Sequence, residues 1–237
     1  MPAPTRRPRR PARARPAAHD QVTRNRLLQT ARRLFPERGY QGVGVREICR
    51  GAGANIAAVN YHFGGKFGLY TEVVQAAIAV LRETNEAAMQ APPGAPADQR
   101  LRMFLRVFLR NIIGKGRGSW IHKLMSRELD DPTPALNLVV EQAIRPRLEY
   151  LSAVAAELIG CDPADQRVWH TVASIQGQCL IYLRNPIGTR LASRWPATPL
   201  EIDAVADHIA EFSLAGIRAI AQTRPGVDLP VPRPSSG

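Results

Sequence analysis

The sequence predicts an all-α protein, and three observations support that class. Residues with high helix propensity, chiefly Ala, Leu, Arg, Glu and Gln, dominate the 237-residue chain. Aromatic residues make up only 6%, and no long segment alternates apolar with polar residues as a half-buried strand does. Apolar residues recur instead at spacings of three and four, between residues that start and stop helices. A chain of this length can bury a core in one or two domains.

Both ends of the chain are predicted to be disordered tails, residues 1–20 and 225–237. The first holds six arginines among prolines and alanines, and the second is also rich in proline. Two interpretations of the first tail stay open. It is either an arm that follows DNA phosphates or enters the minor groove, or an unconstrained tail that includes a misassigned start codon.

The first predicted helix begins near Thr23 and ends at Gly39. Pro36 has no N–H and its ring crowds the preceding turn, so we expect a kink or a frayed last turn. Arginines follow one face of this helix. The apolar face opposite consists of Leu27, Leu28, Ala31, Leu34 and Phe35.

Two short helices follow, at about 45–52 and 56–63. Gly44 stands at the N-cap of the first, and Glu47 is half of a capping box. Gly53 provides the turn between them, and Asn55 caps the second helix. Two glycines after Phe63 end it.

The remainder of the chain is predicted to be helical as well, after a linker at 91–98. Three Thr-Pro or Asp-Pro pairs, at 133–134, 162–163 and 198–199, place an N-cap residue before a proline at the first helical position. Thr198 and Glu201 are also predicted to form a capping box. Pro146 is expected to bend one helix. The predicted segments are about 66–90, 97–113, 119–130, 134–159, 163–184 and 199–222.

Charge is concentrated at one end of the chain. Residues 1–70 hold 14 Lys and Arg against three acidic residues, a net of +11, whereas residues 71–237 hold 18 against 17, a net of +1. This distribution indicates a polyanionic partner for the N-terminal part alone. The alternative is that the basic residues form an ordinary solvated surface.

No feature of the sequence indicates an enzyme, a cofactor or a membrane protein. No apolar run reaches the length of a membrane span, and the basic tail lacks the apolar segment of a secretory signal. Cys49, Cys161 and Cys179 are far apart and fit buried, reduced thiols in a cytoplasmic protein. The spacings of His122, His170 and His208 place no two metal ligands on one helical turn.

Three helices with a glycine-containing turn between the two short ones form a helix-turn-helix arrangement. In such a unit the second short helix lies in the DNA major groove. Asn60 can pair with adenine, Ala57 can meet a thymine methyl, and Tyr61 can reach a base or a phosphate. His62 and Lys66 are expected to hold the DNA backbone. The complete DNA-binding set is Arg46, Asn55, Ala57, Asn60, Tyr61, His62 and Lys66.

Residues 23–70 resemble the DNA-binding domain of the tetracycline-repressor (TetR) family of bacterial regulators. The matching segments are ARRLFPERGYQGVGVREICRGAGA (31–54) and VNYHFGGKFGLY (59–70), which carry the family's His-Phe-x-x-Lys ending. The sequence departs from the family at Pro36, Gly44, Asn60 and Phe67. Asn60, where Tyr is usual, bears on base preference. Segments 119–151 and 174–185 resemble one subgroup, associated with the control of drug-efflux and other transport genes.

The resemblance implies a DNA-binding domain at 21–68 and a ligand-binding and dimerisation domain at 91–224, joined by the helix that starts near Lys66. It implies a homodimer formed through helices 163–184 and 199–222, which binds a near-palindromic operator and is released by a small-molecule effector. The candidate residues for an effector cavity are Phe104, Phe108, Trp120, Met125, Trp169 and Tyr182.

Rival functions have weaker support than this repressor. A hydrolytic site in residues 53–68 would need a nucleophile, and the stretch holds no Ser or Cys. A nucleotide loop would need the GxxxxGK[ST] spacing, which GGKFG lacks. A nucleoid-type DNA-binding protein without ligand control is the remaining alternative, and the large neutral C-terminal part argues against it.

Overall fold

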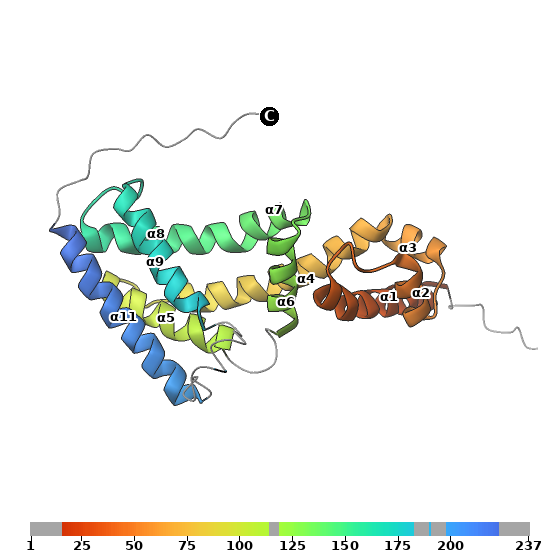
Figure 1. Cartoon of the computed structure of the whole chain (residues 1–237), viewed down its shortest axis with the longest axis horizontal. Helices are drawn as coiled ribbons and strands as arrows, with labels where there is room; N and C mark the ends of the chain where they lie inside the picture. Colours follow the sequence, from red (N-terminus) through yellow and green to blue (C-terminus); the bar gives the residue numbers. More distant parts are fainter. Residues whose placement is uncertain (1–15, 114–118, 183–189, 191–197, 223–237) are drawn as a thin grey trace, which may run out of the picture. The chain divides into compact units, whose positions relative to one another are not determined.

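Helices form every regular element of the described residues in this computed structural model, which describes residues 16–113, 119–182, 190 and 198–222 (Figure 1). The predicted all-α class is therefore confirmed. No described helix is long and apolar enough to cross a bilayer. Residues 1–15 of the first predicted tail and all of the second, 225–237, lie outside the described residues.

The described chain forms two compact units. The first comprises residues up to Ala77 together with Lys123–Ala135, and the second comprises Ile78–His122 and the chain from Leu136 onward. The sequence had instead placed the whole of 91–224 in one domain. The domain boundaries change because the C-terminal part of the helix predicted at 119–130 packs with the N-terminal helices.

The first unit contains α1 (Pro16–Arg38), α2 (Val45–Ala52), α3 (Ile56–Phe63) and the start of α4 (Lys66–Met89). The α1 helix packs on both α2 and α3, which also pack on each other. Leu27, Phe35, Ile48 and Val59 are buried among them. These contacts hold the two short helices, which could not be stable alone.

The start of α1 corrects the predicted tail. Residues 16–20, assigned to the tail, are helical, and the helix begins seven residues before Thr23. Pro16 is compatible with a helix start because the first N–H groups have no intrahelical partner. Pro36 lies inside α1, which continues to Arg38, and Gly39 ends it with a φ of 71°.

The second unit contains the C-terminal half of α4, the start of α6 (Ser119–Asp130) and the remaining helices. Its longest helices are α5 (Ala97–Ile113), α8 (Arg145–Ile159), α9 (Gln166–Leu180) and α11 (Pro199–Ala221). The α5 helix packs against α8 and α11, and α9 packs against α8 and α11 (Figure 1). One continuous apolar core lies among them.

The predicted helix at 134–159 is divided in the structure. It consists of α7 (Ala135–Val139), a π-helical turn (Val140–Ile144) and α8. Pro146 cannot donate to a carbonyl one turn earlier, so the chain widens there. Buried Asn85 donates its side-chain amide to the Ala143 carbonyl at 2.7 Å, which satisfies a group in the widened turn.

The structure corrects the predicted start of α9 and confirms the predicted start of α11. The predicted start of α9 at Pro163 is wrong: Asp162 forms a turn by accepting from Ala164 N–H at 2.8 Å, and Asp165 is the N-cap. Leu180 ends α9, and residues 183–184 of the prediction lie outside the described residues. The predicted capping box of α11 is confirmed by reciprocal bonds between Thr198 and Glu201.

Candidate nucleic-acid interface

The start of α3 is fixed by Asn55. Its backbone is extended, and its side-chain oxygen accepts a hydrogen bond from the Ala58 N–H at 2.9 Å. The predicted cap is confirmed, so this oxygen orients the helix. The left-handed glycines Gly53 and Gly64, with φ of 61° and 69°, end α2 and α3. An L-residue with a side chain would be strained at either position.

The outward face of α3 presents short or planar side chains. Ala57 and Asn60 are exposed, and Tyr61 is 76% exposed, whereas Val59 between them is fully buried. A buried inner face and a polar outer face are what a helix needs to enter a major groove without losing its packing. Three of the predicted base-contacting residues are thus together on one accessible surface.

The position of His62 does not fit the phosphate contact that the sequence suggested. Its side chain is only 7% exposed, and Nε2 lies 3.4 Å from a carboxylate oxygen of Asp20 on α1. The ring also packs edge-on to that of Tyr61, with centroids 4.9 Å apart. This geometry supports a role in fixing the end of α3 against α1.

Lys66 is the first residue of α4. Its Nζ lies 4.2 Å from the centroid of the Tyr40 ring, and partial burial lowers the pKa of its ammonium group. The Tyr40 ring therefore holds the cation of the residue that begins α4, and the first N–H groups of that helix have no partner within the helix. A cation beside a helix N-terminus is a suitable phosphate site.

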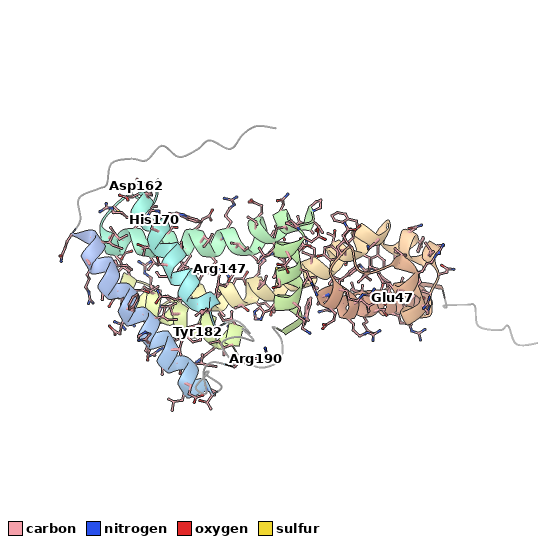
Figure 2. The ribbon with its side chains drawn as sticks, in the orientation of Figure 1. Glu47, Arg147, Asp162, His170, Tyr182 and Arg190 are labelled. Atoms are coloured by element: carbon pink, nitrogen blue, oxygen red, sulfur yellow. The ribbon has the colours of Figure 1, made fainter. Side chains whose placement is uncertain are left out.

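Arg46 is exposed on α2 and has no ion-pair partner among the residues that the structure describes. The neighbouring Glu47 (labelled in Figure 2) does not close the predicted capping box. Its carboxylate instead accepts from the guanidinium of Arg38 at 2.6 Å. This ion pair with Arg38 neutralises the charge of Glu47. The positive charge of Arg46 therefore stays available for an anionic partner.

Sequence reasoning missed the residues that support this surface. The Tyr40 ring contacts the Lys66 ammonium group, and Asp20 pairs with His62. The guanidinium carbon of Arg24 lies 5.1 Å from the centroid of the Phe63 ring. No local pattern marks such partners, because each joins residues more than 20 positions apart in the chain.

The C-terminal half of α6 also belongs to this unit. The Tyr70 hydroxyl on α4 donates to the buried carboxylate of Glu128. Lys123 donates to the Glu37 side chain at 2.5 Å, and Arg127 donates to the Glu37 carbonyl at 2.8 Å. A signal existed in the sequence: Glu128 continues the apolar stripe of α6 at the position one turn after Leu124.

The candidate cavity residues are not all brought together. Phe104 and Phe108 are buried and stacked, with centroids 5.3 Å apart, and Tyr182 packs on the same core. Trp120 is partly buried in the second unit, whereas Met125 belongs to the first. Trp169 is 58% exposed and lines a surface hollow beside α8, which does not support an interior role.

Both the N-terminal and the C-terminal part of the chain match known protein families. The family described as bacterial regulatory proteins, tetR family, matches residues 27–73, and the C-terminal domain of the HTH-type transcriptional dual regulator CecR matches residues 97–217. CecR of Shigella flexneri is 32% identical over 183 residues, which are 73% of this chain and 81% of that protein. The HTH-type transcriptional regulator BetI of Rhizobium meliloti is 26% identical over 190 residues, which are 79% of this chain and 90% of that protein.

Solved structures share the fold. A TetR-family regulator from Streptomyces coelicolor superposes with a TM-score of 0.58 at 21% identity, covering 83% of this chain and 96% of that one. The TetR-family regulator PfmR from Thermus thermophilus gives a TM-score of 0.56 at 21% identity, with coverage of 80% and 97%. The matched relatives are transcriptional regulators rather than enzymes. On these matches and on its helix-turn-helix unit, the chain belongs to the TetR family of bacterial DNA-binding transcriptional regulators, with a C-terminal domain of the CecR type.

Proposed function

We propose that this regulator is a homodimeric repressor that a small-molecule effector releases from a near-palindromic operator. The observation that carries the proposal is the outward face of α3, where Ala57, Asn60 and Tyr61 are accessible above a buried Val59. Arg46, exposed on α2, and Lys66, the first residue of α4, add positive charge to the same unit. Asn and Tyr read base edges, and the two cations contact phosphates on either side.

The surface of α9 and α11 supports the dimer. Phe212 is 65% exposed on α11, and Leu180 and Ile181 are exposed at the end of α9. Between the two helices lies a hollow of about 190 Å³ with small residues at its rim, including Ser174 and Gly216. Exposed apolar side chains beside small residues suit a second copy of the same two helices, related by a twofold axis.

Contacts of α4 and α6 support ligand release. Both helices contribute residues to each of the two compact units. In the first unit Glu128 of α6 is bonded to Tyr70 of α4, and α4 begins at Lys66. Movement of either helix in the effector-binding unit would therefore change the position of α3. Release is then a shift between two conformations that differ in the spacing of the two α3 helices.

The regulated genes are proposed to be transport, efflux or metabolic genes, and the protein is proposed to act in the cytoplasm on the nucleoid. The proposal is tested by measuring binding to the gene's own upstream region and to random DNA at ~150 mM salt, where purely charge-driven binding is weak. A preference of at least about a thousandfold supports an operator. Equal affinity for both DNAs would favour the nucleoid-type alternative.

A further inference from the structure

Arg147 carries a partly buried positive charge in the second unit, with no hydrogen-bond or ion-pair partner among the described residues. It lies on α8, and its guanidinium carbon is 5.0 Å from the centroid of the Phe108 ring on α5 (Arg147 is labelled in Figure 2). Its Nε is fully enclosed and makes no hydrogen bond to a described residue. Within the part of the chain that the structure describes, no carboxylate pairs with this guanidinium.

A matched arginine shows how unusual this is. Arg145, two residues earlier on the same helix, is exposed and bonded through two nitrogens to Glu141, at 2.6 and 2.7 Å. Burial lowers the pKa of Arg147, whereas the bonded carboxylate raises the pKa of Arg145. Buried charges in native proteins are normally paired, so an unpaired one requires an explanation.

The neighbours of Arg147 do not supply the missing negative charge. Cys179 on α9 is a titratable group that interacts electrostatically with Arg147, and burial raises the pKa of that thiol to about 12. The sulfur is therefore a neutral thiol near pH 7 and not a counter-ion. One turn earlier on α9, the side-chain amide of buried Gln176 has both its oxygen and its nitrogen without a partner among the described residues.

Aromatic rings extend from the arginine into the core. We call Phe104, Phe108 and Tyr150 the aromatic cluster: the two Phe rings stack at 15°, and the Tyr150 ring centroid lies 5.9 Å from that of Phe104. The Tyr150 hydroxyl is enclosed and also lacks a partner in the described chain. Phe104 and Phe108 are themselves buried, so a ligand would have to open this part of the core to reach their faces. A cation beside flat apolar faces matches a molecule that has rings and one negative group.

We propose that Arg147 binds an anionic effector: an apolar, ring-bearing molecule whose carboxylate or sulfonate pairs with the guanidinium while its rings pack on the aromatic cluster. The inference rests on the proposed function, since it names the chemical class of the ligand that releases the DNA. An arginine suits this role because its planar fork donates two parallel hydrogen bonds to an oxoanion, and the enclosed site strengthens them.

A purely structural role of Arg147 and a role in anion binding predict different effects of replacing this residue. If Arg147 only held Phe108 by a cation–π contact, replacing it with Met would lower the unfolding temperature and leave ligand preference unchanged. If it is kept for an anion, Arg147→Met removes an unpaired, partly buried charge from the ligand-free protein. The unfolding temperature then stays the same or rises.

The experiment compares two fluorescent probes with the same rings. One is 8-anilinonaphthalene-1-sulfonate, an anion, and the other is N-phenyl-1-naphthylamine, which lacks the sulfonate. Each is titrated into the full-length wild type, Arg147→Met, Arg147→Lys and the matched control Arg145→Met. Circular dichroism confirms folding, and Arg147→Gln replaces Arg147→Met if the latter does not fold.

We expect Arg147→Met to weaken binding of the anion by about tenfold or more and to leave the neutral probe within about twofold. Arg147→Lys should lie between, and Arg145→Met should match the wild type. An anion affinity that is unchanged in Arg147→Met, or both probes weakened alike, would overturn the proposal. DNA release is measured separately: an Arg147-dependent anion site whose occupancy never alters DNA affinity would refute ligand release and leave the site standing.

Discussion

The hydroxyl of Tyr70 donates a hydrogen bond to the carboxylate of Glu128, a residue 58 positions later in the chain and only 1% exposed. The same carboxylate accepts from the backbone N–H and the hydroxyl of Thr133, at 3.3 and 3.1 Å. Burial and the bond to Glu128 raise the pKa of Tyr70 well above its usual value, so the hydroxyl remains a donor. This bond attaches α6 to α4 within the DNA-binding unit.

Tyr70→Phe should therefore destabilise the protein. It leaves the edge-to-face ring contact with Phe35 intact and removes only the donor to a buried carboxylate, for which we expect a loss of roughly 1.5–3 kcal/mol in the free energy of unfolding. Urea unfolding of the full-length protein measures the loss. Tyr40→Phe is the control, since the Tyr40 hydroxyl has no hydrogen-bond partner among the described residues, and it should cost less than ~0.5 kcal/mol. Equal effects of the two substitutions would contradict a specific role for the Glu128 bond.

Asn60→Ala should relax base preference. Asn60 is exposed in the last turn of α3, where a side-chain amide can pair with two edge atoms of adenine. The substitution should reduce discrimination at one base pair of each half-site by ~1–3 kcal/mol and leave preference elsewhere unchanged. Selection from a randomised operator library, compared between wild type and variant, measures it. If the selected half-sites are identical, Asn60 does not read a base.

Lys66→Ala and His62→Ala should differ in their dependence on salt. Removing the Lys66 cation should weaken binding to all sequences and lower the slope of log K against log salt by about 0.9 for each phosphate that the variant no longer neutralises. His62 is largely enclosed and faces Asp20, so its removal should lower the unfolding temperature and leave the slope unchanged. Titrations at several salt concentrations separate the two. A reduced slope for His62→Ala would restore the phosphate contact that its sequence position suggested.

The sequence predicted those features that local chemistry determines. Asn55, Gly53 and the pair Thr198 and Glu201 start or stop helices through contacts within four residues, and each is found as predicted. The outward positions of Asn60 and Tyr61 followed from helical spacing alone. The supporting pairs could not be predicted, since Tyr40 with Lys66 and Tyr70 with Glu128 depend on how distant segments pack. The start of α9 was misplaced because Asp162-Pro163 and Asp165 both offer cap chemistry, and only the folded chain selects between them.

Phe212→Asp should dissociate the proposed dimer. Phe212 is a large apolar side chain exposed on α11 beside the hollow between α9 and α11, and twofold symmetry would bury it twice. We expect the dimer dissociation constant to rise about a hundredfold or more, with a parallel loss of operator binding. Sedimentation velocity measures the change. Leu129→Asp is the control, because Leu129 is also a largely exposed apolar residue but lies on α6. A Phe212→Asp protein that remains dimeric would exclude this face.

Asp165 should make the stability of α9 depend on pH in the acid range. Hydrogen bonds from the side chain and the backbone N–H of Arg167 lower the pKa of Asp165 to about 2. Because the folded pKa lies below the unfolded value of about 3.9, the charged form stabilises the fold above pH ~4, and this contribution is lost as the pH falls toward 2. Asp165→Asn keeps an N-cap acceptor but removes the charge. The wild type should therefore unfold at a higher urea concentration than Asp165→Asn at about pH 6, and the two midpoints should converge as the pH falls from about 4 to about 2. A constant difference across that range would show that the charge of Asp165 contributes nothing to folding.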